Sequence, residues 1–359
     1  MRIAVDAFGS DICPRPDVEG AVLAAREWGD EIILVGPEER IRQELAKYPT
    51  EGLNIRVVHA PDVLTMEDHS DEVRQKEDAS IRVGMRLVKH GEADAFVSAG
   101  NTIAILSSAI FDLRRIRGIR RPALGVLYPL APKPMLLLDM GATADPKPEY
   151  LLQFAQMGAI YMEKVWGIAN PRVGLLTNGE EAEKGSMVVR DTHQLLEQSA
   201  LNFIGNVEPK EMSRGAADVV VTDGFTGNLV VKTAESVVSF IGRLVKHDLL
   251  GNSLAKVALV LMLPGLIAAL PGLLLLYPAL RGILKRTDYA EYGGGLLFGV
   301  DGIVIVGHGR SNAKAIKNAI RQGREAAAAQ VLQTIKAGLQ AEQGAEGEEI
   351  GRASCRERV

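Results

Sequence analysis

The chain has 359 residues and a mass of 38.7 kDa, and 47% of its residues are hydrophobic, enough to build a buried core. Its 41 Lys and Arg stand against 45 Asp and Glu, a net charge of -4, which excludes a global attraction to nucleic acid. Two cysteines, Cys13 and Cys355, exclude a disulfide scaffold, and six scattered histidines without metal-ligand spacing make a structural metal site unexpected.

Short apolar runs rich in Val, Ile and Leu recur along the chain and predict strands buried on both faces. They lie at residues 3–5, 32–35, 55–58, 95–97, 135–138, 173–176, 219–221 and 303–306. Helix-like segments separate them, at residues 17–28, 38–47, 81–90, 103–116, 149–166, 186–198, 228–246 and 312–331. This alternation predicts an α/β fold, a Rossmann-like three-layer αβα arrangement with a mostly parallel sheet.

The ends of the chain bear on domain organisation. The first residues read directly into a strand without the pattern of a secretory signal, so we expect a cytoplasmic protein. We expect one α/β catalytic domain over residues 1–336, with an apolar helical arm inserted at about 247–290. Residues 337–359 lose apolar periodicity and predict a disordered tail. Within it, residues 349–359 resemble the translation of a sequencing adapter, which suggests a gene-model artefact.

The segment 257–280 is rich in leucine and contains no charged residue. Its length would allow one membrane span, but Pro264, Pro271 and Pro278 interrupt it, and the chain then returns to a strand of the same sheet. We therefore expect a kinked arm projecting from the domain that contacts a membrane surface. Flanking cations are placed to meet anionic headgroups: Lys256, Arg281, Lys285 and Arg286. A dimer-interface or core-capping hairpin is the alternative.

Several predicted strands end in small, polar, glycine-containing turns. The clearest is Asp223-Gly224-Phe225-Thr226-Gly227-Asn228, and the others are Ser98-Ala99-Gly100-Asn101-Thr102, Asp139-Met140-Gly141-Ala142 and Thr177-Asn178-Gly179. Ligands of open α/β sheets bind outside the carboxyl ends of strands, where helix N-termini converge. The turns therefore predict a phosphate-like ligand. Both GxxxxGK[ST] and a first-strand GxGxxG are missing, which weakens a nucleotide interpretation.

Charged residues near these turns are further candidates. Lys184 follows the strand that ends near Thr177 and could reach an anion held by the neighbouring turns, although a solvated charge run is the simpler interpretation. His308 follows another strand, and although a lone histidine is more often a structural residue than a catalyst, it is the histidine to test. A basic cluster could cap a helix end or dock an acidic protein. Its members are Arg114, Arg115, Arg117, Arg120 and Arg121.

Taken together, ordered motifs in this chain resemble those of the PlsX-type phosphate acyltransferases. The resemblance covers about residues 1–330 and rests on Asp6-Ala7-x-Gly9-x-Asp11, Ser98 to Thr102, Leu138 to Ala142, Lys184-Gly185, Phe203 to Glu208, Val221 to Asn228, Tyr292-Gly293-Gly294 and His308-Gly309-x-Ser311. Their shared order makes the match specific, whereas each motif alone is weak.

The resemblance implies transfer of a long-chain fatty acyl group from acyl carrier protein to inorganic phosphate, giving acyl phosphate for bacterial phospholipid synthesis. It also implies a homodimer on the fold of phosphate acetyltransferases and isopropylmalate-type dehydrogenases, without a cofactor and peripherally attached to the inner face of the membrane. A membrane-bound glycerol-3-phosphate acyltransferase is an expected partner, and the basic cluster would meet the acidic carrier protein.

By position, the resemblance makes Lys184, Asn228 and Asn101 the candidate catalytic residues. The residues expected to bind phosphate or the acyl group are Ser98, Gly100, Thr102, Asp139, Gly141, Asp223, Gly224, Thr226, Gly227 and His308. The chain departs from the family pattern at Ser10, Ile12, Ile103 and Thr143, where the family usually has glycine, histidine, glycine and asparagine. We expect Ile103 either to narrow the pocket or to alter how closely the backbone approaches a ligand.

A mechanism that fits these residue types needs no strong base. The thiol leaving group has a pKa of roughly 8.5, and phosphate is itself the nucleophile, so positioning and oxyanion stabilisation dominate. We expect backbone N–H groups of the turns at 98–102 and 222–228, with Lys184, to form one cradle for phosphate, and Asn101 or Asn228 to donate to the oxyanion. Two other classes of function stay open. A nicotinamide dehydrogenase could use the same fold, although the dinucleotide motif is missing, and the apolar arm alone suggests a non-catalytic membrane scaffold.

Overall fold

The computed structural model describes residues 1–65, 67–68, 70–128, 130–244 and 289–341, with short pieces at 257–258, 261–262, 265, 271–272 and 274–278. Much of the predicted apolar segment 257–280, and all of residues 349–359, lie outside the described residues.

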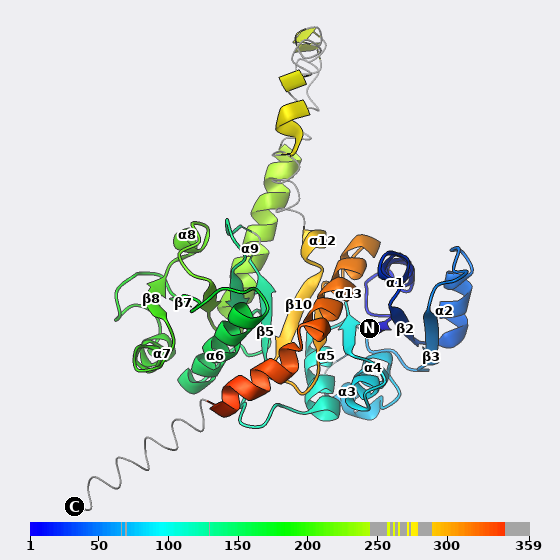
Figure 1. The fold of residues 1–359 in the computed structure, drawn as a ribbon, viewed down its shortest axis with the longest axis horizontal. Helices are drawn as coiled ribbons and strands as arrows, with labels where there is room; N and C mark the ends of the chain where they lie inside the picture. The colour runs from blue at the N-terminus through cyan, green and yellow to red at the C-terminus, as the bar shows by residue number, and fades with distance from the viewer. Residues whose placement is uncertain are drawn as a thin grey trace, which may run out of the picture.

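An 11-stranded sheet forms the centre of the molecule (Figure 1). Its strands are β1 (Arg2–Asp6), β2 (Glu31–Gly36), β3 (Ile55–His59), β4 (Ala95–Ser98), β5 (Ala123–Leu127), β6 (Leu136–Leu138), β7 (Val173–Leu176), β8 (Phe203–Val207), β9 (Val219–Val221), β10 (Gly294–Phe298) and β11 (Val304–Gly307). Their order across the sheet is β3-β2-β1-β4-β11-β10-β5-β6-β9-β7-β8. Every predicted strand is present, and β5, β8 and β10 are additional.

The sheet consists of two parallel sets of strands that run in opposite directions. One set contains β3, β2, β1, β4 and β11, and the other contains β6, β9, β7 and β8. Between them, β10 pairs antiparallel with β11 and β5, and β5 pairs antiparallel with β6. Each antiparallel pairing reverses the strand direction. The carboxyl ends of β4 and β11 therefore lie at the sheet edge opposite to those of β6, β9 and β7.

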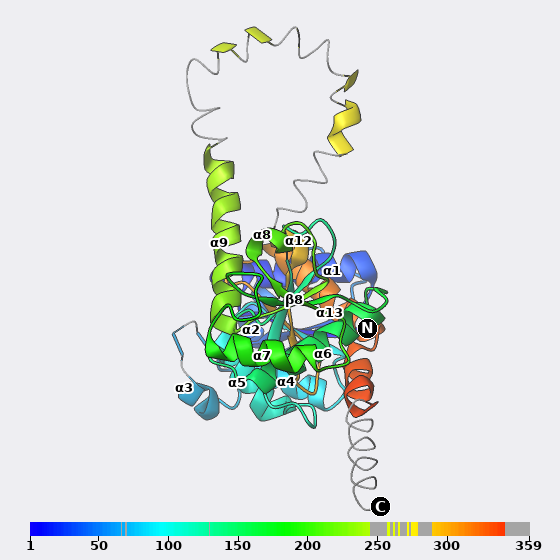
Figure 2. The same ribbon diagram turned by 90° about the vertical axis from the view of Figure 1, so that its left-hand side faces the viewer.

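Helices cover both faces of the sheet (Figure 2). They are α1 (Arg15–Trp28), α2 (Glu38–Leu45), α3 (Ser70–Gln75), α4 (Ser80–Lys89), α5 (Thr102–Ser108), the π-helix η1 (Ala109–Leu113), α6 (Pro148–Lys164), α7 (Met187–Glu197), α8 (Pro209–Met212), α9 (Gly224–Arg243), α12 (Tyr289–Tyr292) and α13 (Ala313–Ala328). The predicted three-layer αβα arrangement is confirmed.

Alternating side chains on the strands assign the helices to the two faces. Ile3 and Val5 of β1 share a core cluster with residues of α1, α6 and α13, whereas the intervening Ala4 belongs to a second cluster with residues of α4 and α5. Leu137 of β6 joins a third cluster with residues of α8 and α9. Both faces of these strands are buried, which is why their sequences are nearly continuous apolar runs.

Helix α9 extends beyond the body of the molecule (Figures 1 and 2). It begins at Gly224, four residues before the expected start at Asn228, because Asp223 caps it. Its C-terminal half exposes Val237, Phe240 and Ile241 to 48%, 53% and 54% of their surface. The described part of α9 is thus a projecting helix with apolar side chains on its surface.

Two other expected elements differ from the structure. The helix expected at 103–116 is shorter, because α5 passes into the π-helix η1, which ends at Leu113. Residues 331–341 are helical, and Leu339 is only 4% exposed within the main core cluster. The expected disorder from residue 337 is therefore wrong for 337–341, since burial of Leu339 gives this helix a tertiary anchor.

Candidate functional site

The turn from Asp223 to Asn228 forms the N-terminus of α9 at the carboxyl end of β9. The Asp223 carboxylate accepts hydrogen bonds from the backbone N–H and the hydroxyl of Thr226, both at 2.7 Å. The backbone N–H of Gly224 donates to the carbonyl oxygen of Thr143 at 2.8 Å, and Gly227 N–H donates to the carbonyl of Asp223 at 2.9 Å. These polar groups hold the turn together and fix it against the neighbouring turn that follows β6.

Asp139 organises that neighbouring turn. Its buried carboxylate accepts hydrogen bonds from the backbone N–H groups of Leu124, Ala142 and Thr143 at 2.8, 3.1 and 2.6 Å. Burial raises the pKa of Asp139 to about 6, although these hydrogen bonds oppose the shift. In this structure the carboxylate joins the turn to β5. Its three backbone partners give Asp139 a structural role in this turn, and its expected contact with substrate stays a prediction.

Asn228 and Gly141 meet where these two turns pack together. Gly141 has a φ of 115°, which favours glycine, and a Cβ at this position would stand 3.5 Å from the Asn228 amide nitrogen. The Asn228 side chain is half-buried, and it makes no hydrogen bond to another described residue. Its amide N–H groups are therefore available as donors beside the α9 N-terminus.

Lys184 lies in the loop between β7 and α7, at the same edge of the sheet. Its side chain is exposed and makes no ion pair with any residue that the structure describes. The aliphatic part of the side chain packs on Gly179, where an added Cβ would stand 2.8 Å from Lys184 Cγ. Because β7 is the direct neighbour of β9, the Lys184 loop and the Asp223–Asn228 turn follow adjacent parallel strands.

A different group of predicted residues lies at the opposite edge, after β4. The Ser98 hydroxyl donates to the Asp6 carboxylate at 2.7 Å and accepts from the Gly100 N–H at 3.1 Å. Gly9 packs there because a Cβ would stand 2.8 Å from the Ala99 nitrogen. Burial raises the pKa of Asp6, so its carboxyl group keeps its proton to a higher pH than that of an exposed aspartic acid.

Asn101 caps α5 rather than presenting a free amide. Its Oδ1 accepts from the N–H groups of Ile103 and Ala104 at 2.9 and 3.3 Å, and its Nδ2 donates to the Asp68 carbonyl at 3.1 Å. Thr102 is the first residue of the helix. Both ends of the Asn101 amide are thus used within the chain, unlike the amide of Asn228.

His308 is exposed beyond β11, at the same edge as Ser98, and its Nδ1 accepts from the Arg310 N–H at 3.3 Å. Arg310 lies 4.0 Å from Glu235 in the middle of α9. Helix α9 therefore connects the two edges. Twelve residues separate Asp223 from Glu235, a distance of about 18 Å at 1.5 Å per residue.

The predicted turns consequently form two groups instead of one cradle. Lys184, Asp139, Gly141 and the turn at 223–228 share one edge, whereas Ser98, Gly100, Asn101, Thr102 and His308 share the other. The expectation of a single set of strand ends is wrong because β10 and β5 reverse the strand direction. Because the two groups lie at opposite edges of the sheet, one phosphate ion contacts only one of them.

The residues that depart from the family pattern have definite surroundings. The Ser10 hydroxyl donates to Asp17 at 2.5 Å, and burial raises the pKa of Asp17 well above its usual range. Thr143 donates through its hydroxyl to the Pro122 carbonyl at 3.3 Å. Ile12 and Ile103 are 71% and 56% exposed. The Ile103 side chain therefore points to the surface beside the start of α5.

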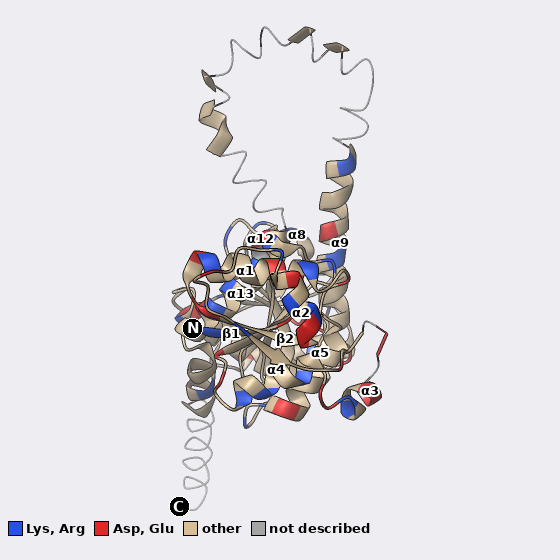
Figure 3. Cartoon of the chain, turned by 90° about the vertical axis from the view of Figure 1, so that its right-hand side faces the viewer, with Lys and Arg blue, Asp and Glu red and all other residues tan. Residues whose placement is uncertain are grey.

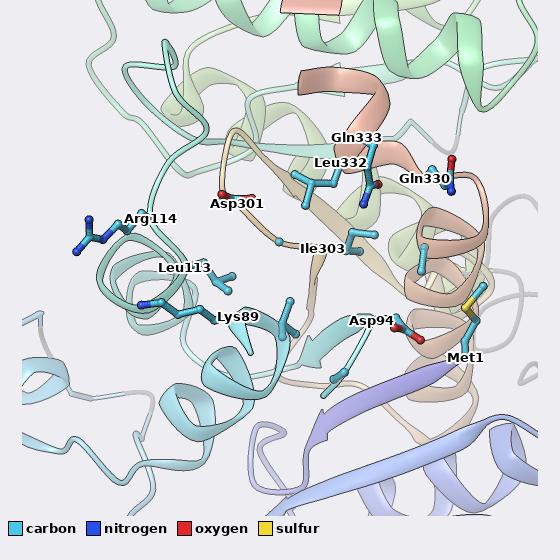
Figure 4. Close-up of a pocket in the computed structure, with 14 residues that line it drawn as sticks. Met1, Lys89, Asp94, Leu113, Arg114, Asp301, Ile303, Gln330, Leu332 and Gln333 are labelled. Atoms are coloured by element: carbon cyan, nitrogen blue, oxygen red, sulfur yellow. The ribbon is translucent and has the colours of Figure 1, made fainter. Parts of the chain in front are cut away.

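A pocket in the described structure is lined by residues other than the predicted phosphate and catalytic residues, and Figure 4 shows those that line it. It has a volume of about 770 Å³ and is lined by residues such as Met1, Lys89, Asp94, Arg114 and Asp301. Asp94 precedes β4 and Asp301 precedes β11, so the pocket opens at the amino ends of these strands. Apart from Arg114, none of the residues singled out from the sequence lines it.

The basic cluster lies on the loop that joins η1 to β5. All of its arginines are exposed, and none forms an ion pair with an acidic residue in the described part of the chain. Arg115 instead donates to the carbonyl oxygen of Arg120, and the Arg120 N–H donates to Gln153 at 2.9 Å. On the side seen in Figure 3, by contrast, basic and acidic residues are interspersed over the helices. The cluster members are Arg114, Arg115, Arg117, Arg120 and Arg121.

Comparisons with known proteins show the family of this chain. A family model described as "Fatty acid synthesis protein" matches residues 1–334. The chain belongs to this family. It is 50% identical over 360 residues to a protein named "Phosphate acyltransferase" from Herpetosiphon aurantiacus, covering 95% of this chain and 98% of the relative. A protein of the same name from Trichlorobacter lovleyi is 44% identical, with 96% of each chain covered. The present family member is therefore an acyltransferase.

Solved structures show the same fold at low sequence identity. The EutD phosphotransacetylase from Staphylococcus aureus has a TM-score of 0.55 and 14% identity, covering 90% of this chain and 94% of its own. A phosphotransacetylase from Streptococcus pyogenes has a TM-score of 0.54 and 18% identity, covering 93% and 94%. The expected relation to the phosphate acetyltransferase fold is thus confirmed. Among the described helices, none has the length and apolar character needed to cross a bilayer.

Proposed function

We propose that this acyltransferase transfers a long-chain fatty acyl group reversibly from acyl carrier protein to inorganic phosphate, forming acyl phosphate for bacterial phospholipid synthesis. Family membership and the names of the relatives support the phosphate acyltransferase activity. The observation that carries the site assignment is the open amide of Asn228 and the unpaired amine of Lys184 after adjacent parallel strands.

In the proposed reaction, a phosphate oxygen attacks the thioester carbonyl carbon and the carrier thiolate leaves with the electron pair of the C–S bond. The thiol has a pKa of roughly 8.5, so the thiolate leaves readily. Lys184 holds the phosphate, and Asn228 donates a hydrogen bond to the oxyanion that forms on the carbonyl oxygen. The rate enhancement comes from positioning phosphate against the thioester and from these fixed donors.

The group at the opposite edge has a different role in this proposal. Ser98, Gly100, Asn101, Thr102 and His308 lie at the sheet edge opposite to the Asp223 turn, so they contact another part of the extended acyl donor. The turn at Asp139 and Gly141, with Gly224, Thr226 and Gly227, holds Asn228 in place. No cofactor takes part in this scheme.

The proposed partners follow from the surface. The exposed arginine cluster binds the acidic acyl carrier protein, since its cations have no acidic partner among the described residues. The exposed apolar side chains of α9 support peripheral contact with the inner face of the cell membrane, where a membrane-bound glycerol-3-phosphate acyltransferase receives the product. Co-sedimentation with anionic vesicles tests this contact. The protein is a homodimer in this proposal.

The deciding experiment supplies the protein with a long-chain acyl carrier protein thioester and phosphate, and traps acyl phosphate with hydroxylamine. Because hydroxylamine also attacks the thioester directly, the rate without enzyme is subtracted, and we expect enzyme-dependent acyl hydroxamate to form only when phosphate is present. Acyl-CoA in place of the carrier protein measures how much the carrier contributes. Loss of thioester without phosphate, at the same rate as with it, would identify a hydrolase and overturn the proposal.

A further inference from the structure

The carbonyl oxygen of Glu181 is the point at which the Lys184 loop is fixed. It accepts the Lys184 backbone N–H at 3.0 Å and the Asn206 side-chain nitrogen at 2.6 Å. Asn206 is 7% exposed and lies near the end of β8, whose neighbour β7 leads into the loop. One buried side chain thus holds the turn that ends at Lys184.

The chemistry of the neighbours fixes the orientation of the Asn206 amide. A carbonyl oxygen can only accept, so the Asn206 nitrogen faces Glu181 and its oxygen faces His193. The oxygen lies 2.9 Å from His193 Nδ1, which must therefore carry a proton. His193 also packs edge-on against Phe203, with ring centroids 5.1 Å apart. The Asn206 amide thus accepts from His193 of α7 with its oxygen and donates to Glu181 with its nitrogen.

Two other contacts lie near the start of the Lys184 loop. The Thr177 N–H donates to the Val207 carbonyl at 3.1 Å, and Lys210 pairs with Glu180 at 3.4 Å on the exposed side. The exposed ion pair contributes little, whereas a buried hydrogen bond is costly to lose. Within residues 180–184, the hydrogen bond from Asn206 to the Glu181 carbonyl is the contact made by a buried side chain.

We propose that Asn206 is a positioning residue, which acts through the Glu181 carbonyl to hold Lys184 where it binds phosphate, and that His193 orients Asn206. This inference rests on the proposed function for the role of Lys184. It predicts that loss of the Asn206 donor weakens phosphate binding selectively, because the acyl donor is recognised elsewhere.

Asn206→Asp is the sharpest variant, because aspartate keeps the acceptor for His193 and removes the donor to Glu181. We expect the KM for phosphate to rise about tenfold, with the KM for the acyl donor changed less than about twofold. Asn202→Asp is the matched control, since Asn202 also donates to a backbone carbonyl, that of Asn170, at 3.0 Å outside the loop. The control should leave both KM values unchanged.

A second readout is independent of activity. Trypsin cleaves after lysine, and a loosened loop exposes the bond between Lys184 and Gly185. We expect Asn206→Asp to raise the cleavage rate at this bond about tenfold, with other sites and the melting temperature close to those of Asn202→Asp. His193→Phe, which keeps a ring against Phe203 but removes the donor to Asn206, should produce a smaller increase.

A double-mutant cycle separates positioning from general damage. In a Lys184→Ala background, Asn206→Asp should raise the phosphate KM no further, because its effect passes through Lys184. An additive effect overturns the proposal, as does an unchanged cleavage rate at Lys184 in Asn206→Asp. If Lys184→Ala alone leaves acyl phosphate formation unaltered, the proposed function of Lys184 fails, while the cleavage result still decides whether Asn206 holds the loop.

Discussion

Gly227 of α9 packs directly against the backbone of Asp139, and a Cβ on Gly227 would stand 1.9 Å from the Asp139 carbonyl oxygen. No backbone atom tolerates such a contact, so the helix and the turn after β6 can approach this closely only with glycine at this position. The contact brings Asn228, the next residue, beside Gly141. The position of the Asn228 amide, the proposed oxyanion donor, thus depends on the absence of a Cβ at Gly227.

Gly227→Ala should therefore lower the free energy of unfolding by about 3 kcal/mol, through overpacking against a backbone that cannot move aside. Gly242→Ala is the matched control in the same helix, because a Cβ there meets no atom within 4 Å. It should be neutral or stabilise the protein by up to about 1 kcal/mol. Urea denaturation of both variants measures the difference, and equal stabilities would contradict the packing argument.

The raised pKa of Asp139 predicts a pH dependence of stability. Burial raises this pKa to about 6 in the folded protein, above the value near 3.9 in the unfolded chain. The folded state therefore binds the proton more tightly, so the contribution of Asp139 is full below about pH 4 and falls as the pH rises to 6. At about 1.4 kcal/mol per pKa unit, the loss is roughly 3 kcal/mol.

Asp139→Asn tests this pH dependence, because it removes the ionisable group at position 139. Asp6 and Asp17 are present in both proteins, so their titration cancels in the comparison. The stability of the wild type relative to the variant should fall by roughly 2 kcal/mol between pH 4 and pH 6, most of the full loss. Denaturant unfolding across that range gives the difference at each pH. A difference independent of pH would show that Asp139 titrates alike in the folded and unfolded states.

The sequence predicted the fold class well, because strands buried on both faces leave long apolar runs that are visible without a structure. The strands that escaped detection lack this pattern. β10 begins with Gly294-Gly295, β5 contains Gly125, and β8 is a half-exposed strand with Asn206 among its residues. Gly125 is required because Phe298 packs on it, a tertiary reason that local sequence cannot show.

Missing those strands had a direct effect on the predicted site. β10 and β5 are the antiparallel strands that reverse the sheet, so without them all glycine turns seemed to share one edge. The motifs correctly marked Asp139, Asp223 and Ser98 as turn-forming residues, but a motif does not distinguish a carboxylate that binds substrate from one that holds backbone N–H groups. Asn206 lies within the quoted motif Phe203 to Glu208, but its role was not predicted, because its partner Glu181 lies 25 positions away.

Asn228 and Asn101 should respond differently to truncation. Asn228→Ala removes an open donor, so kcat should fall about 100-fold with stability nearly unchanged. Asn101→Ala removes the cap of α5 and should cost about 1 kcal/mol of stability, with a much smaller change in kcat. Steady-state kinetics and thermal unfolding of both variants decide between them. A larger loss of kcat in Asn101→Ala would move the oxyanion donor to the other edge of the sheet.

The arginine cluster predicts a charge-dependent step in donor binding. Arg117 and Arg120 are exposed, and their guanidinium groups form no ion pair among the described residues, so reversing them should not disrupt the fold. The double variant Arg117→Glu with Arg120→Glu should raise the KM for the acyl carrier protein thioester about tenfold at low salt, because acidic carrier and loop then repel each other. The KM for phosphate should stay the same.

Salt separates this effect from a structural one. Interactions between exposed charges weaken as the Debye length falls from about 10 Å at 0.1 M to about 3 Å at 1 M ionic strength, so wild type and variant should converge at high salt. Arg42→Glu serves as the control. It reverses the charge of an exposed arginine on α2, the helix between β2 and the edge strand β3. If that control raises the carrier KM equally, overall net charge and not the cluster governs the encounter.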